Sequence, residues 1–225
     1  MSRGRQRRSA IGSRQISSRG VATLRRQCWL FAIGSSLFAV ATIPGLPATT
    51  GNGLPNLLCF IGSWFFTTAA WMQLVLSGVP LAIGWYSAAV QFAGTILFNI
   101  STGSALWAHA VKRERRLVWA PDALGSIAFL VSAVLGVVAV TAVVGIFELK
   151  SRDWQAEWIN LLGCVAFGVS ALGAFVTRTG VTVDAVLANV GTFIGALCFL
   201  IAALLILPSR PGSQSDASTT GSRTS

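Results

Sequence analysis

Six polar residues lie within or at the edges of long apolar stretches of the chain, where their side chains could hydrogen-bond to a small solute or ion. A polar side chain in hydrocarbon is unfavourable unless it has a partner. These residues therefore either line a polar seam along which a solute moves, or hydrogen-bond to neighbouring helices and hold them together. The second interpretation is the simpler one, and the first stays open. The residues are Gln91, Asn99, Asp122, Asn160, Asn189 and Thr192.

Three acidic residues stand where an apolar stretch begins. Asp122 follows Pro121, Glu157 opens the fifth stretch and Asp184 precedes the sixth. A carboxylate at a helix start can accept hydrogen bonds from free backbone N–H groups and complements the helix dipole. We therefore expect three helix caps, rather than the mid-membrane carboxylate that a proton-coupled or cation-coupled transporter usually needs.

The chain offers little material for catalysis or metal binding. It contains a single histidine, His109, and seven acidic residues. It lacks the zinc-binding HExxH motif, the nucleophile motif GxSxG and the phosphate-binding motif GxxxxGK[ST]. We expect no enzymatic activity, no catalytic residues, no metal site and no cofactor. The four cysteines form no CxxC pair and are interpreted as packing residues in the apolar stretches: Cys28, Cys59, Cys164 and Cys198.

Composition places the elements that carry these residues in a bilayer. The chain has 225 residues, of which 53% are hydrophobic and only 11% charged. Six apolar runs have about the length that a helix needs to cross a membrane, and they are continuous rather than alternating, which favours helices over barrel strands. We expect an all-α integral membrane bundle of six transmembrane helices, a multi-pass protein of the cell membrane. The runs cover residues 28–46, 56–77, 83–108, 121–147, 157–177 and 185–207.

The two ends of the chain are polar and are expected to lie outside the bundle. Residues 1–27 include eight arginines and no acid, which indicates a disordered basic cytoplasmic arm that meets anionic lipid and carries no specific nucleic-acid site. Residues 208–225 form a disordered polar tail. Counting lysines and arginines favours cytoplasmic N- and C-termini, although the KRERR segment at 112–116 then falls in an external loop against the usual preference.

A glycine followed four residues later by phenylalanine occurs once in each apolar run. With 23 glycines and 13 phenylalanines in 225 residues, chance alone predicts about one such pair, and six occur. Glycine lets membrane helices approach closely, and phenylalanine at i+4 lies on the same face, where it can fill the groove beside a neighbour's glycine. We interpret the pairs as helix-packing residues: Gly34 and Phe38, Gly62 and Phe66, Gly94 and Phe98, Gly125 and Phe129, Gly163 and Phe167, Gly195 and Phe199.

The spacing of these glycines predicts a transmembrane domain over residues 28–207 built from three repeated hairpins, at about 28–77, 83–147 and 157–207. Three segments carry a further resemblance: WINLLGCVAFGVSA at 158–171, APDALGSIAFLVSA at 120–133 and LANVGTFIGALCFLIAALLIL at 187–207. They resemble the YrhK-like domain, a membrane module of helical hairpins whose repeats carry a tryptophan, an amide or acid, a glycine and then a phenylalanine. The resemblance implies a multi-pass membrane protein without an assigned activity.

Two functions follow from these features. The first is a non-enzymatic component for helix packing or assembly. Its partner, besides the lipid bilayer, is a second copy of itself or another membrane protein. The contact is made through glycine faces left exposed on the bundle. The second is a channel or carrier for a small neutral or weakly polar solute, with Gln91, Asn99, Asn160 and Asn189 around a central cavity. A carrier requires at least two of these amides to face a common cavity.

Overall fold

The computed structural model describes residues 23–78, 81–108 and 110–208. In these residues the protein is helical, with one isolated bridge between Val176 and Thr182, which confirms the all-α prediction. Residues 23–41 form the first helix. The other helices are α2 (Leu46–Thr50), α3 (Gly53–Leu76), α4 (Ile83–Ser104), α5 (Val111–Arg113), the π-helix η1 (Glu114–Trp119), α6 (Ala120–Val144), α7 (Arg152–Gly173) and α8 (Ala185–Leu205).

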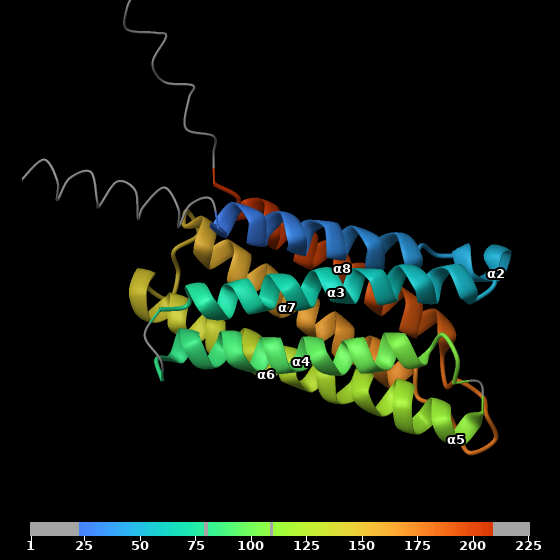
Figure 1. Ribbon diagram of the computed structural model, residues 1–225. Helices are drawn as coiled ribbons and strands as arrows, with labels where there is room; N and C mark the ends of the chain where they lie inside the picture. Colours follow the sequence, from blue (N-terminus) through green and yellow to red (C-terminus); the bar gives the residue numbers. More distant parts are fainter. Residues whose placement is uncertain (1–22, 79–80, 109, 209–225) are drawn as a thin grey trace, which may run out of the picture.

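The long helices lie roughly antiparallel, side by side around a common centre (Figure 1). The first helix contacts α3, α4 contacts α6, and α7 contacts α8, while further contacts join α3 to α4 and α6 to α7. We call the end of the bundle that holds Leu24 and Ile206 the terminal end, and the opposite end, with the start of α3 and of α8, the distal end. Consecutive long helices therefore point in alternating directions between the two ends.

Four helices are long and apolar enough to cross a membrane: Gly53–Leu76, Val111–Val144, Arg152–Gly173 and Ala185–Leu205. Their outward faces carry large apolar side chains, among them Trp64, Trp71 and Leu172, each more than half exposed. Apolar surface on this scale requires a nonpolar surrounding, so the protein associates with a membrane. Helix α4 has a similar length, but it carries Gln91, Asn99 and a run of hydroxyl side chains.

The KRERR segment is not a loop. Residues Val111–Arg113 are α-helical, Glu114–Trp119 form a π-helix, and α6 continues from there without a break. Pro121 explains the irregularity, because it has no N–H group and its ring crowds the carbonyl four residues earlier, so the wider π-turn accommodates it inside one helix. The prediction that a helix begins at Pro121 was therefore wrong.

Local sequence determines where the other helices begin and end. The Ser151 side chain accepts a hydrogen bond from the Trp154 backbone N–H at 3.3 Å and caps α7. Gly145 ends α6 in a backbone conformation, φ 104°, that favours glycine. The chain is helical from residue 23, so the predicted arm is too long at 27; residues 1–22 of that arm, the predicted tail from 209 onward and His109 lie outside the described residues.

Candidate functional site

The six motif glycines meet six motif phenylalanines from neighbouring helices in three reciprocal pairs of helices. In the first pair, a Cβ atom placed on Gly34 would lie 2.7 Å from the Phe66 ring, and one on Gly62 would lie 3.1 Å from the Phe38 ring. It would also lie 3.1 Å from the Gly34 carbonyl oxygen, so the two backbones themselves are in contact. A glycine at each crossing is what permits this approach.

The other two pairs of helices repeat this contact. A Cβ atom on Gly94 would lie 2.7 Å from the Phe129 ring, and one on Gly125 would lie 2.9 Å from the Phe98 ring. Between α7 and α8, a Cβ atom on Gly163 would lie 2.9 Å from the Phe199 ring, and Gly195 faces the Phe167 ring. The motif residues are therefore used between helices of one chain.

The six phenylalanine rings converge at the middle of the bundle. All six are buried, with 4% to 6% exposure. Ring centroids lie 5.3 Å apart between Phe167 and Phe199 and 4.9 Å apart between Phe98 and Phe129. Contacts of 5.7 Å between Phe66 and Phe199 and of 6.2 Å between Phe38 and Phe167 link the helix pairs. We call these six side chains the phenylalanine constriction: Phe38, Phe66, Phe98, Phe129, Phe167 and Phe199.

The constriction separates two cavities whose walls are mostly apolar and carry several polar side chains. The void between its rings has a volume of about 10 Å³, which is at the limit of what one water molecule requires. The terminal cavity, of about 260 Å³, has Phe66 and Phe199 among its lining residues. The distal cavity, of about 280 Å³, is lined by Phe38, Phe98 and Phe167. The bundle therefore has a cavity with polar side chains toward each end and an aromatic barrier between the two cavities.

Helix direction decides which cavity receives which predicted residue. The position three residues before the motif glycine points to the terminal cavity in the first helix, α4 and α7, which places Phe31, Gln91 and Asn160 there. The same position in the antiparallel α3, α6 and α8 points to the distal cavity and places Cys59, Asp122 and Thr192 there. Asn189 also lines the distal cavity. The predicted polar residues thus form two groups instead of one seam.

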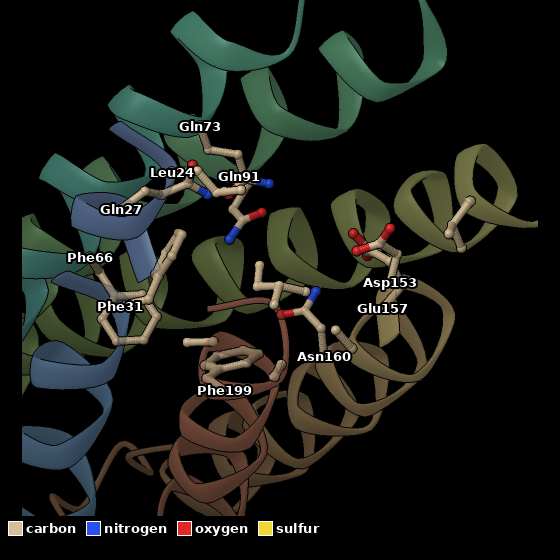
Figure 2. A pocket seen from close by; sticks show the side chains of 15 residues that line it. Leu24, Gln27, Phe31, Phe66, Gln73, Gln91, Asp153, Glu157, Asn160 and Phe199 are labelled. Atoms are coloured by element: carbon tan, nitrogen blue, oxygen red, sulfur yellow. The ribbon is translucent and has the colours of Figure 1, made fainter. Parts of the chain in front are cut away.

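Two amides, Gln91 and Asn160, meet the requirement of a shared cavity (Figure 2). Asn99 lines neither cavity and instead donates a hydrogen bond from Nδ2 to Thr67 Oγ1 of α3 at 2.8 Å. The hydroxyls of Thr192 and Ser170 are hydrogen-bonded at 2.7 Å between α8 and α7. Asn99 and Thr192 therefore hold neighbouring helices together, as the simpler interpretation of the polar residues predicts.

Glu157 is not a helix cap. Helix α7 begins five residues earlier at Arg152, and the Glu157 carboxyl group lies with that of Asp153 in the terminal cavity (Figure 2). It fits against Gly136 of α6, where an added Cβ atom would collide with it, and the same Cβ atom would lie 3.4 Å from Ser87 Oγ of α4. The carboxyl group therefore occupies a slot between three helices.

Asp122 does not act as the helix cap that the sequence predicts. Because α6 continues from the π-helix, its side chain caps no free helix start and lines the distal cavity with Glu114. Asp184 does act as predicted, since its Oδ1 accepts a hydrogen bond from the Leu187 backbone N–H at 2.9 Å and caps α8. Among the described residues, no salt bridge or hydrogen bond joins the carboxyl groups of Asp122 or Glu157 to a protein partner.

Sequence reasoning missed four cavity residues. Gln27 had been placed in the arm, and Asp153 and Glu114 in connecting loops, whereas Gln27 and Asp153 line the terminal cavity and Glu114 the distal cavity. Gln73 lies inside an apolar stretch, and its polarity there was a usable signal. The Gln27, Gln73 and Gln91 side chains point toward one another from three helices (Figure 2).

Comparison of the chain with protein-family models finds no matching family, and comparisons with curated proteins and with solved structures find no match. The geometry of the two cavities and of the constriction is therefore the basis on which function is assigned.

Proposed function

We propose that this protein is a membrane channel or carrier for a small polar solute, whose path follows the bundle axis. Six helices, arranged as three hairpins like those of the YrhK-like domain, cross the cell membrane with both termini cytoplasmic. The observation that carries the proposal is the pair of cavities, about 260 and 280 Å³, that hold polar side chains and lie on opposite sides of the phenylalanine constriction. Such an arrangement gives a solute access from either end while the aromatic barrier is closed.

A helix-packing or assembly component is the weaker proposal. It required glycine faces left exposed for a partner, and the six motif glycines contact phenylalanines of their own chain. A protein that served only for packing would also have no use for carboxyl groups in internal cavities, since a polar group in the membrane interior is costly.

Permeability of proteoliposomes tests the proposal. The Phe98→Ala/Phe167→Ala variant removes two adjacent rings of the constriction, whose centroids lie 5.8 Å apart. We expect it to raise the permeability to urea, glycerol or ethylammonium, measured by stopped-flow light scattering, above that of the unsubstituted protein. Phe147→Ala is the control, because Phe147 is 86% exposed and lies outside the constriction. A folded double variant whose liposomes match protein-free liposomes for every probe would overturn the proposal.

A further inference from the structure

Charge is distributed unevenly between the cavities and the rest of the molecule. The formal net charge is +10, from 17 lysines and arginines against seven acids. Yet the terminal cavity is lined by Asp153 and Glu157, and the distal cavity by Glu114 and Asp122, whereas no described lysine or arginine lines either one. Four of the seven acids thus face the cavities, which makes both of them electronegative and favourable for a cation.

Gln27 provides a second and independent observation. Its side chain is 5% exposed, and it makes no hydrogen bond to any described residue. It points into the terminal cavity, toward Gln73 and Gln91 (Figure 2). Because the protein encloses this side chain but gives its amide no partner, the amide can hydrogen-bond to a ligand or to solvent in the cavity.

The floor of the terminal cavity is aromatic. Phe31, Phe66 and Phe199 line it, and the Phe31 and Phe66 rings meet edge to face with centroids 5.5 Å apart. Aromatic faces attract organic cations through the ring quadrupole. A carboxylate wall, amide oxygens and an aromatic floor together match the chemistry of an ammonium group bonded to carbon: N–H donors on one side and apolar C–H groups on the other.

We propose that the terminal cavity binds a small organic ammonium ion, with its N–H groups directed to Glu157 and to the amide oxygens, and its alkyl part against the phenylalanine rings. The inference rests on the proposed function and names the class of solute. It also accounts for Glu157, because a carboxylate enclosed by α4, α6 and α7 loses much of its hydration, and an entering cation compensates for that loss.

Binding to the full chain in detergent micelles tests the inference separately from transport. Ethylammonium is the probe, with ethanol as the uncharged analogue and sodium as the inorganic cation. Isothermal titration calorimetry should show saturable binding of ethylammonium that neither ethanol nor sodium displaces at equal concentration. Glu157→Gln should weaken this binding about tenfold or more, since it removes a charge-assisted hydrogen bond. The control Glu148→Gln removes an acid that lines neither cavity and should leave binding unchanged.

If Glu157→Gln does not fold, Gln27→Leu provides the second variant and should weaken binding several-fold. The inference is overturned if ethylammonium does not bind saturably, if sodium displaces it equally well, or if the cavity variants bind as tightly as Glu148→Gln. The outcomes separate the two proposals. Binding without flux would refute the transport function and keep the ammonium site, whereas flux of urea or glycerol without ethylammonium binding would refute the site and keep the transport function.

Discussion

Two glycines of helix α7 should respond in opposite ways to the same substitution. An added Cβ atom on Gly163 would lie 2.9 Å from the Phe199 ring and 3.0 Å from Cys198 Cβ, whereas one on Gly168 would have no atom within 4 Å. Overpacking a close contact costs about 1–3 kcal/mol. Alanine at the open position can gain up to about 1 kcal/mol through helix propensity. Gly163→Ala and Gly168→Ala should therefore differ in free energy of unfolding by about 1–4 kcal/mol.

The assay is equilibrium unfolding of each variant in the same detergent, followed by tryptophan fluorescence. For a chain of this size a melting temperature difference of about 2 °C or more is expected. A double-mutant cycle with Phe199→Leu should give a coupling energy of about 0.5–3 kcal/mol with Gly163→Ala and none with Gly168→Ala. If Gly163→Ala is as stable as Gly168→Ala, the close contact between α7 and α8 does not exist as described, and the constriction that depends on it is misplaced.

Three further predictions concern polar contacts and topology. Thr67→Val should lower the free energy of unfolding in detergent by about 1–3 kcal/mol, because it leaves the Asn99 amide, which donates to Thr67 at 2.8 Å, without an acceptor. Asn99→Leu should lower it by less, and equal effects of the two substitutions would contradict this reasoning. Asp184→Ala should lower stability by about 0.5–2 kcal/mol and speed amide exchange at the start of α8, and unchanged exchange would argue against the cap. Cysteines introduced at the exposed Arg152 and Arg178 should react with a membrane-impermeant maleimide from opposite faces; modification of both from one face would exclude an odd number of crossings between them.

The sequence was sufficient to predict features that involve residues of a single helix. Glycine and phenylalanine four residues apart share a face in any helix, so their register could be determined without knowing the neighbours. The cap at Asp184 was predictable for the same reason, since it joins residues three positions apart. At Asp122 the same reasoning failed, because the π-helix carries the chain through Pro121 and leaves no free helix start there.

The site itself required information that no single helix contains. Gln91 and Asp122 stand at the same position relative to their glycines, yet they line opposite cavities because α4 and α6 run in opposite directions. Gln27, Gln73 and Gln91 are distant in sequence, and only the packing of their helices brings them to one cavity.

By itself, the sequence determined an all-α, membrane-associated chain with one close-packing position in each apolar run, because composition and helical periodicity act locally. The tertiary structure decided which helices pair, that six rings meet at one level, and that carboxyl groups face internal cavities instead of helix ends. These features follow from contacts between segments far apart in the chain, which depend on helix direction and on packing around a shared centre.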